Sequence, residues 1–334
     1  MKPWFLIPVQ RAHDWAPFFI NTYARLVPKR ELVWSPLEWR GLRFRNRLGI
    51  AGGVDKDAIG APAWIKLGAG FVEIGTVTPL PQGPNPGPTV GRDLSRLALW
   101  NKLGFPSQGA RAVKERLQSM PRTVPVFVNI GKNRDTPNEN AANDYVSLVK
   151  EFEGLADAFV VNISSPNTKN LRDLQQTESL RALLNAVLGA RGARVDRGPA
   201  NEISRTPTLL KLSPDVSDAE LEGILQTSYE CGIDGWILTN TTRERPAGSP
   251  FPHEGGLSGK PLAGRSKHVL ARTLSVLGSK KEGRLLISAG GIMTAGDVRE
   301  RLDMGADLVQ VYSALIFSGP GFFRSVARVL GDRK

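Results

Sequence analysis

The chain has 334 residues, a single cysteine (Cys231), 41% hydrophobic residues and a formal net charge of +12. No run of about 18 apolar residues marks a membrane-spanning helix, and no disulfide can form within the chain, which favours a reducing compartment. The positive charge suits nucleic acid, an anionic membrane surface or small anions, but zinc-finger spacing, RNP-like motifs and long basic blocks are absent, which lowers the case for nucleic acid.

Residues 1–40 differ from the rest of the chain and predict an amphipathic helix. Large apolar residues, most of them aromatic, recur with one threonine at spacings of three and four, as on one face of a helix: Trp15, Phe18, Phe19, Thr22, Tyr23, Leu26 and Val27. The first 31 residues carry five basic and two acidic residues. Such a helix either lies in a membrane interface or packs on the main domain, and composition alone does not decide between the two.

From residue 41 to 334 the chain repeats an apolar strand, a polar or glycine-rich loop and usually a helical stretch. The predicted strands are 48–51, 71–77, 124–130, 158–163, 208–212, 235–239, 284–288 and 308–311, and the helical patterns include 110–117, 143–151, 179–188, 218–228, 266–277 and 295–302. Eight such units predict the α/β class and a (β/α)8 TIM barrel. An open doubly wound sheet is the alternative, but no GxGxxG motif opens a helix after the first strand.

Three long segments interrupt this pattern. Residues 79–96 are rich in Pro and Gly and predict a surface excursion over the mouth of the barrel. Residues 189–207 form a basic, polar loop at the periphery, and residues 242–259 carry the glycines and prolines of a mobile lid. Long loops in compact domains are usually functional or disordered.

Nearly every predicted strand ends in residues that can hold a polar ligand. The first strand is followed by Gly52, Gly53 and Lys56. The residues at the other strand ends are Thr76, Asn129, Lys132, Asn162, Ser165, Asn167, Lys211, Ser213, Thr239, Asn240, Thr241, Gly290, Gly291, Tyr312 and Ser313. In a TIM barrel these ends meet on one face, so they predict a pocket of amides, hydroxyls and lysines. It has no carboxylate pair and no metal-binding cluster.

Other features of the sequence refine this pocket. The loops after strands seven and eight suit a phosphate, because Gly290 and Gly291 leave backbone N–H groups free and residues 294–297 resemble a capping box. An ordinary capped αβ unit is the alternative. The three histidines, His13, His253 and His268, follow no strand and are expected to be surface or packing residues.

Ten motifs, taken together, resemble those of the class 2 dihydroorotate dehydrogenases, which are quinone-dependent and membrane-associated. They are GGVDK (52–56), EIGTVTP (73–79), NKLGF (101–105), VNIGKN (128–133), NISSPNT (162–168), KLSPD (211–215), TNTT (239–242), GGLSG (255–259), GGI (290–292) and VYS (311–313). The resemblance runs from about residue 40 to the C-terminus and keeps the order of the family's motifs.

The resemblance implies a reaction. Dihydroorotate would be oxidised to orotate in pyrimidine biosynthesis, with hydride passing from C6 to FMN and a proton passing from C5 to Ser165 as general base. Class 1 enzymes carry cysteine at this position, so serine favours class 2. Thr168 is a candidate proton relay because it stands close to Ser165 in the sequence. A lysine such as Lys211 would offset negative charge on the reduced ring.

The resemblance also assigns residues to ligands. The implied substrate-binding residues are Lys56, Asn101, Lys102, Leu103, Gly104, Phe105, Asn162, Asn167, Asn240 and Thr241. The implied FMN-binding residues are Gly52, Gly53, Val54, Asp55, Lys56, Thr76, Asn129, Asn162, Lys211, Thr239, Gly259, Gly291, Tyr312 and Ser313. No metal is implied.

The remaining implications concern partners. Ubiquinone or menaquinone would be reached through residues 1–40, with a monomeric enzyme peripheral on the cytoplasmic side of the inner membrane and no nucleic-acid partner. Two positions depart from the family pattern: Lys102 replaces an arginine, and residues 89–92 replace most of a Pro-Arg-x-Phe-Arg motif.

Two alternatives stand beside this interpretation. A flavin barrel could act on another dihydropyrimidine or on dihydrouridine in tRNA, although the NISSPN motif and residues 255–259 argue against it. A non-catalytic flavoprotein or scaffold is the second, but Lys56, Ser165 and Lys211 argue against it, because a binding module needs no base.

Overall fold

The computed structural model describes residues 2–29, 31–192 and 205–331, and its centre is a closed barrel of eight parallel strands. The strands pair around the ring in chain order, with the last beside the first. They are β3 (Leu48–Asp55), β4 (Phe71–Val77), β7 (Val126–Ile130), β8 (Ala158–Asn162), β9 (Thr208–Leu212), β10 (Gly235–Leu238), β12 (Leu285–Ala289) and β13 (Leu308–Val311). The predicted TIM barrel is confirmed, and the open sheet is excluded.

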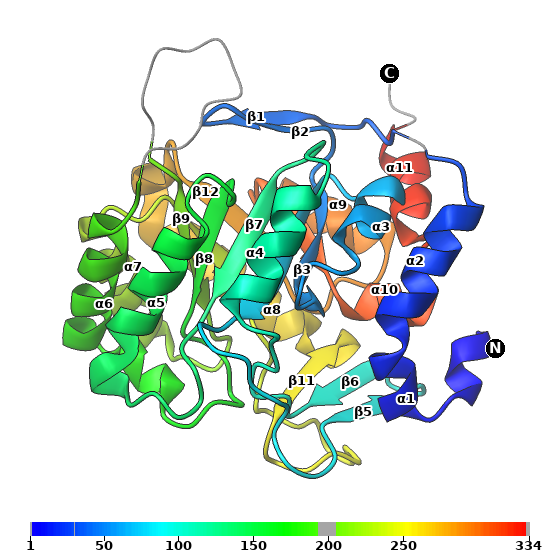
Figure 1. Ribbon diagram of the computed structural model, residues 1–334, viewed down its shortest axis with the longest axis horizontal. Helices are drawn as coiled ribbons and strands as arrows, with labels where there is room; N and C mark the ends of the chain where they lie inside the picture. Colours follow the sequence, from blue (N-terminus) through cyan, green and yellow to red (C-terminus); the bar gives the residue numbers. More distant parts are fainter. Residues whose placement is uncertain (1, 30, 193–204, 332–334) are drawn as a thin grey trace.

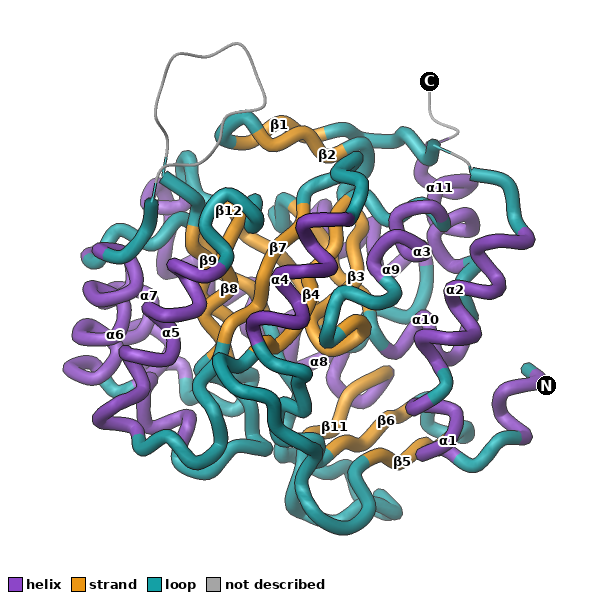
Figure 2. The backbone as a smooth tube through the Cα atoms, in the orientation of Figure 1, coloured by secondary structure: helices purple, strands orange, loops and turns teal. Residues whose placement is uncertain are grey.

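Helices surround this barrel, as Figures 1 and 2 show. They are α3 (Ala61–Lys66), α4 (Ala110–Ser119), α5 (Ala141–Glu151), α6 (Thr177–Gly189), α7 (Asp218–Glu230), α8 (Ala263–Leu277), α9 (Ala295–Asp303), α10 (Ser313–Ser318) and α11 (Phe322–Gly331). Short 3-10 helices are η2 (Asn138–Asn140), η3 (Leu171–Gln175), η4 (Lys260–Leu262) and η5 (Gly278–Lys281). All six predicted helical patterns are confirmed. Their apolar positions pack against the outer faces of the strands and form the larger core.

A hairpin closes the amino-terminal end of the barrel. Strands β1 (Leu37–Trp39) and β2 (Leu42–Phe44) pair antiparallel, and Phe44 lies against Phe71 and Phe127 with ring centroids 5.7 and 6.2 Å away. Burying a phenylalanine side chain stabilises the fold by about 1.5–3 kcal/mol. This apolar plug leaves the opposite, carboxyl end of the barrel for a polar pocket. The predicted domain boundary between residues 40 and 41 falls in the turn of this hairpin and stays a prediction.

A second small sheet lies at the carboxyl end of the barrel. Its strands are β5 (Val90–Asp93), β6 (Ala98–Asn101) and β11 (Gly256–Gly259), and both pairings are antiparallel. The sheet joins the two predicted excursions, 79–96 and 242–259, which the sequence analysis treated as separate loops. Residues 193–204 of the predicted peripheral loop lie outside the described residues.

The N-terminal segment lies against one side of the barrel (Figure 1). It consists of η1 (Pro3–Leu6), α1 (Val9–Asp14) and α2 (Ala16–Leu26), and α2 packs on α3. The buried residues of α2 are Ile20 and Ala24, whereas Phe18 and Leu26 are 68% and 80% exposed. The predicted apolar stripe therefore faces outward, and a different face of α2 packs on the barrel. No helix in the described part of the chain could span a membrane.

Candidate active site

A pocket opens at the carboxyl ends of the barrel strands, where the sequence placed it. Its open volume is about 1010 Å³, including solvent space at its mouth. The predicted site residues that line it are Gly52, Gly53, Lys56, Thr76, Asn101, Leu103, Gly104, Phe105, Asn162, Ser165, Asn167, Lys211, Thr239, Asn240, Thr241, Gly291, Tyr312 and Ser313. These eighteen residues, together with Gly290 of the predicted phosphate loop, come from the carboxyl ends of seven of the eight barrel strands, from the end of β6 and from the segment after it, and they meet around one cavity.

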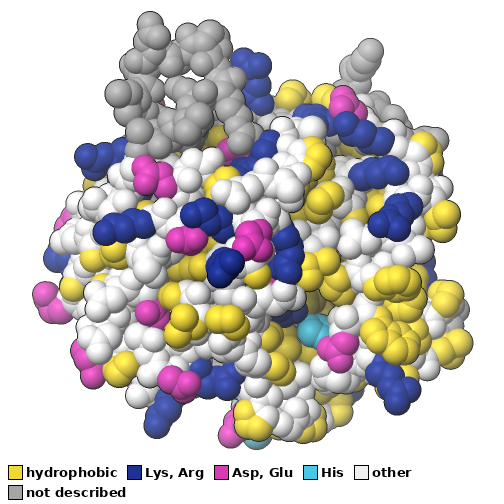
Figure 3. Space-filling view, in the orientation of Figure 1, with side chains coloured by type: hydrophobic (Ala, Val, Ile, Leu, Met, Phe, Trp, Pro, Cys, Tyr) yellow, Lys and Arg dark blue, Asp and Glu magenta, His cyan; other side chains and the backbone are white. Residues whose placement is uncertain are grey.

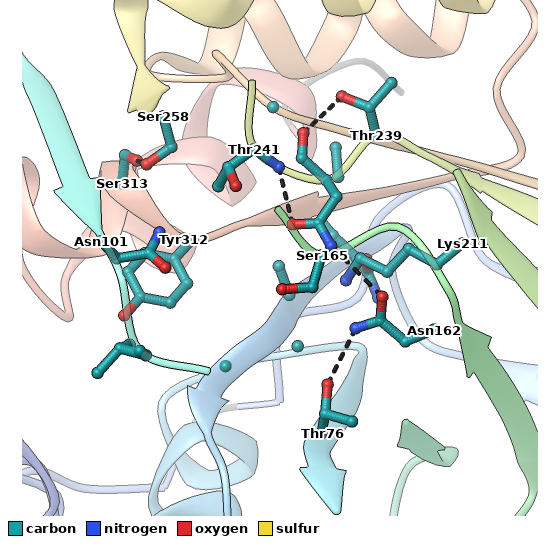
Figure 4. A pocket seen from close by; sticks show the side chains of 18 of the residues that line it. Thr76, Asn101, Asn162, Ser165, Lys211, Thr239, Thr241, Ser258, Tyr312 and Ser313 are labelled. Atoms are coloured by element: carbon teal, nitrogen blue, oxygen red, sulfur yellow. Dashed lines mark hydrogen bonds between the residues drawn. The ribbon is translucent and has the colours of Figure 1, made fainter. Parts of the chain in front are cut away.

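Ser165 lies near the centre of this pocket. Strand β8 ends at Asn162, four residues before Pro166, which cannot donate to a strand ladder. The loop between them carries Ser165 into the cavity. In Figure 4 Ser165 lies between Lys211 and Asn162 on one side and Asn101 and Tyr312 on the other. Its side chain is buried.

The hydroxyl of Ser165 has few protein partners. Its Oγ accepts from the backbone N–H of Asn167 at 3.2 Å. Within the described residues no histidine or carboxylate hydrogen-bonds to it. The Oγ1 of Thr168, three residues on, is buried and has no hydrogen-bond partner among the described residues. A buried hydroxyl without a partner is costly unless a ligand or water completes it.

A buried ion pair forms the floor of the pocket. Glu73 is fully buried, and its Oε1 accepts from Lys211 Nζ at 2.9 Å. Asn129 Nδ2 donates to the same oxygen, and Gln310 Nε2 donates to Oε2 at 2.6 Å. A Cβ on Gly52 would lie 2.3 Å from Oε1, so that glycine makes room for the ion pair. Sequence reasoning missed Glu73, although a carboxylate inside an apolar strand is itself a signal.

Polar side chains above the floor are linked to one another. Asn162 Nδ2 donates to Thr76 Oγ1 at 2.9 Å, and Asn240 Nδ2 donates to Ser164 Oγ at 3.1 Å. Asn167 Nδ2 donates to Asn101 Oδ1 at 2.7 Å. These links hold the amides in fixed orientations, which pre-organises the site for a polar ring.

Lys56 connects the pocket to the N-terminal segment. Its Nζ lies 3.1 Å from Nε2 of His13, whose Nδ1 contacts Asp14 at 3.0 Å. Burial lowers the pKa of Lys56, although the negative charges of Asp57, Asp55 and Asp14 act to raise it. Burial, and then the charge of Lys56, lower the pKa of His13. His13 does not itself line the pocket, but its ring contacts a pocket lysine, a contact that the sequence did not predict.

Further contacts fix the N-terminal segment beside the pocket. Arg92 donates to the carbonyl oxygens of Phe5 and Ile7 at 3.1 and 3.4 Å, and its guanidinium carbon lies 4.9 Å from the Phe5 ring centroid. Thr89 Oγ1 donates to Gln10 at 2.9 Å. The segment 89–92, which departs from the family pattern, thus holds the N-terminal segment in place.

The glycine loop after β12 packs on the start of α8. Gly290 and Gly291 have φ values of +99° and +72°, and a Cβ on Gly291 would lie 2.2 Å from the Cα of Ala263. The carbonyl of Gly290 accepts from Ser266 Oγ at 2.7 Å and from Arg301 at 3.2 Å. Arg301 is buried, which lowers its pKa to about 10, and sequence reasoning missed it. Together these residues fix the loop that the sequence predicted for a phosphate.

Two neighbouring details complete this end of the pocket. Thr294 and Asp297 form the predicted capping box at the start of α9, with Asp297 N–H donating to Thr294 Oγ1 at 3.1 Å. Ser258 Oγ and Ser313 Oγ lie 3.1 Å apart across the pocket wall. Ser258 comes from β11, so the small sheet contributes to the lining.

Five predicted contact residues do not line the pocket: Lys102, Val54, Asp55, Asn129 and Gly259. Lys102 forms an ion pair with Glu254 at the surface. Gly259 has a φ of +89°, and a Cβ there would lie 2.1 Å from the carbonyl oxygen of Leu97, so it serves the turn beside Ser258. Asn129 reaches the site through Glu73.

Asp55 and Val54 act on the loop that carries Lys56. Asp55 accepts from the backbone N–H groups of Ile59 and Gly60 at 3.0 and 2.9 Å. Burial raises its pKa to about 6 in spite of these bonds. Val54 packs against the apolar core. Both residues therefore position the loop and make no direct lining contact.

Known proteins resemble this chain over most of its length. The sequence model described as Dihydroorotate dehydrogenase matches residues 37–333. This chain belongs to the dihydroorotate dehydrogenase family. A curated relative from Acidithiobacillus ferrooxidans, named dihydroorotate dehydrogenase (quinone), is 44% identical over 298 residues, which cover 87% of this chain and 79% of the relative. A relative of the same name from Deinococcus radiodurans is 43% identical and covers 85% and 76%.

A solved structure agrees with these sequence relatives. The crystal structure of DHODH in complex with ferulenol from Eimeria tenella matches with a TM-score of 0.86 at 34% identity, covering 96% of this chain and 90% of that chain. The curated relatives carry the quinone designation, so the chain falls in the quinone-dependent branch of the dihydroorotate dehydrogenase family.

Members of the dihydroorotate dehydrogenase family use a flavin, and the pocket fits one. Gln310 lines the cavity, and its Oε1 is buried and has no hydrogen-bond partner among the described residues. Three glycines with positive φ values expose their backbone to the cavity without a side chain: Gly53, Gly290 and Gly291. Lys211 supplies a cation beside the cavity. A flat ring with polar edges and a phosphate tail needs these groups.

Proposed function

We propose that this chain oxidises dihydroorotate to orotate in pyrimidine biosynthesis and passes the electrons to a quinone. The observation that carries this proposal is the placement of Ser165 in one pocket with Lys56, Lys211 and four asparagines. A base, a cation for a carboxylate and amides for a dihydropyrimidine ring thus face one cavity. Membership of the quinone-dependent branch supports the same reaction.

We propose FMN as the flavin. The fixed glycine loop at Gly290 and Gly291, next to the start of α8, suits a single terminal phosphate, because a helix N-terminus and free backbone N–H groups attract anions. A bound flavin would supply the acceptor for the hydride that leaves dihydroorotate. Lys211, held by Glu73, places a positive charge at the floor of the pocket.

The substrate is held by the upper part of the pocket. Lys56 pairs with the carboxylate of dihydroorotate, and Asn101, Asn162, Asn167 and Asn240 hydrogen-bond to the ring. Asn167 Oδ1 is buried and has no hydrogen-bond partner among the described residues, so a ring N–H would satisfy it. This arrangement discriminates for a ring that offers both donors and acceptors.

Ser165 takes the proton from C5 of the substrate. A serine is a weak base at neutral pH, so the proton on its own hydroxyl must leave as the new one arrives. The unpartnered hydroxyl of Thr168 stands three residues on and offers an acceptor for that proton. Burial of the pocket strengthens each of these polar interactions by excluding water.

The N-terminal segment supports a membrane role. Its outward stripe is apolar, its charge is positive, and it contacts the pocket through His13 and Lys56. Quinones with long apolar tails reside in membranes, so this segment would bring the pocket to them. We propose residues 1–40 as the membrane and quinone segment of a monomeric enzyme that is peripheral on the cytoplasmic side of the inner membrane.

An anaerobic absorbance titration tests the proposal. Dihydroorotate should bleach the flavin spectrum of the purified protein, and a soluble quinone should restore it, whereas NAD and fumarate should not. A flavin that ignores dihydroorotate would point to another ring substrate. If the protein contained no flavin and bound none after FMN was added, the non-catalytic scaffold would be the remaining interpretation.

A further inference from the structure

A small cleft lies where α2, α3 and α11 meet, away from the pocket. Its open volume is about 450 Å³, and Tyr23, Val27, Leu67 and Pro320 form much of its wall. Two cations also line it: Lys66, the last residue of α3, and Arg324, in the first turn of α11. Three elements far apart in the sequence thus build one concave site.

The two cations of this cleft are uncompensated. Within the described residues neither Lys66 nor Arg324 forms an ion pair or a side-chain hydrogen bond, and no residue lining the cleft is acidic. The first turn of α11 carries no acidic residue either, although that position favours negative charge. The charge of this lining therefore favours an anionic ligand.

The surroundings of the cleft identify the kind of anion. Figure 3 shows hydrophobic side chains gathered over α2, with Lys and Arg side chains at their border. Tyr23 belongs to both features, since it lines the cleft and is 41% exposed on the outward stripe. Leu26, which directly precedes Val27 of the cleft wall, is 80% exposed. Cations beside an exposed apolar stripe match a molecule with an anionic head and apolar tails.

We propose that this cleft binds the phosphate of an anionic phospholipid, between Lys66 and Arg324, while the acyl chains lie along the outward stripe of α2. This inference rests on the proposed membrane contact and adds a lipid specificity to it. The N–H groups of both cations donate to the phosphate oxygens, as in other charge-assisted hydrogen bonds. The bound lipid fixes how α2 sits on the membrane.

Vesicle binding of the holoenzyme tests this site. Binding is measured by co-sedimentation with vesicles of phosphatidylcholine alone and with vesicles that also contain phosphatidylglycerol, for the wild type, K66Q/R324Q and R11Q/R25Q. The last variant is a matched control: it removes two charges from α1 and α2 of the N-terminal segment, but Arg11 and Arg25 do not line the cleft. Oxidation of dihydroorotate with a soluble quinone checks that each variant is folded.

The expected result separates a site from diffuse attraction. Direct charge-assisted contacts are stronger than diffuse attraction to a surface, so K66Q/R324Q should lose about tenfold more affinity for phosphatidylglycerol vesicles than R11Q/R25Q loses. Inorganic phosphate should not release the wild type from these vesicles. Both variants should keep wild-type turnover with the soluble quinone.

Other outcomes overturn the proposal in distinguishable ways. Equal losses in the two variants, or equal wild-type binding to both kinds of vesicle, would mean that the cleft does not select a lipid phosphate. Release by inorganic phosphate would make the cleft a site for the free ion. If the wild type binds neither kind of vesicle, the membrane contact itself is wrong. If the wild type does not oxidise dihydroorotate with the soluble quinone, the proposed reaction is wrong instead.

Discussion

The floor of the pocket and the N-terminal segment are built on opposite principles. At the floor, Glu73 is fully buried, and both of its oxygens accept hydrogen bonds from Lys211, Asn129 or Gln310. The N-terminal segment buries only Ile20 and Ala24 of α2 and leaves large side chains exposed. Buried hydrogen bonds to both oxygens of Glu73 fix the floor of the pocket. The N-terminal segment is held by only a few contacts, which are partly exposed.

This difference matches the two halves of the proposed reaction. Hydride and proton transfer need atoms placed within a fraction of an ångström, which a closed hydrogen-bond network supplies. Delivery of electrons to a membrane quinone needs an apolar surface that can meet lipid. The contact between Lys56 and His13 is where the two regions touch.

The largest expected effect belongs to Ser165, above the floor. Ser165→Ala should slow the reduction of the flavin by dihydroorotate about 10²–10⁴-fold, which is the usual rate contribution of a positioned general base. The flavin should stay bound. Rapid mixing under anaerobic conditions measures this rate. Reduction at a near-normal rate would remove the serine from the proposed chemistry.

Glu73→Gln should break the floor itself. The change leaves Lys211 buried without its counter-charge, which typically costs about 3–5 kcal/mol of unfolding free energy. Denaturant unfolding measures this loss. Glu230→Gln is the matched control, because Glu230 pairs with Arg181 at the exposed surface, where the same change should matter little. Equal stabilities of the two variants would contradict the role given to the floor.

Thr168→Val keeps the shape of the side chain and removes its hydroxyl. If Thr168 relays the proton from Ser165, flavin reduction should slow by roughly tenfold, less than the loss of the base, with little change in the affinity for dihydroorotate. The same rapid-mixing experiment, run over a range of substrate concentrations, separates the two quantities. An unchanged rate would assign the relay to water.

The smallest effect concerns pH at the junction of the two regions. Burial and Lys56 lower the pKa of His13 in the folded protein, so an undocked segment binds a proton more readily than a docked one. The part of the docking free energy that depends on neutral His13 is therefore fully present above the ordinary histidine pKa of 6.5. It weakens as the pH falls below that value. Hydrogen exchange of residues 9–26 should rise on acidification in the wild type, beyond the intrinsic effect of pH. If the wild type and His13→Gln exchanged equally at every pH, protonation of His13 would not control docking of the segment.

The sequence predicted the barrel well for a physical reason. Strands such as 71–77 and 158–163 are apolar along their whole length, and each ends at a polar or glycine-rich turn, so local pattern alone sets their limits. Fourteen of the eighteen pocket residues were predicted because the carboxyl ends of parallel strands must meet, whereas Asn101, Leu103, Gly104 and Phe105 came only from the resemblance. The resemblance to the family then assigned their roles.

The parts that the sequence did not predict depend on distant contacts. The pairing of β6 with β5 and β11 joins two segments that each look like loops. His13 contacts Lys56 from 43 residues away, and Arg301 reaches back to the start of α8. Glu73 and Gln310 show a local signal, since each is a polar residue within an apolar strand, but their pairing comes only from closure of the barrel.

The most direct test measures both half-reactions in two variants. Phe18→Ser/Leu26→Ser removes apolar contact from the outward stripe of α2, and Ser165→Ala removes the base from the pocket. In sequential rapid mixing, the stripe variant should reduce its flavin normally but reoxidise slowly with a vesicle-borne quinone, and normally with a soluble one. Ser165→Ala, reduced chemically, should reoxidise at the wild-type rate. If each variant slowed both half-reactions equally, the separation of the two regions would be contradicted.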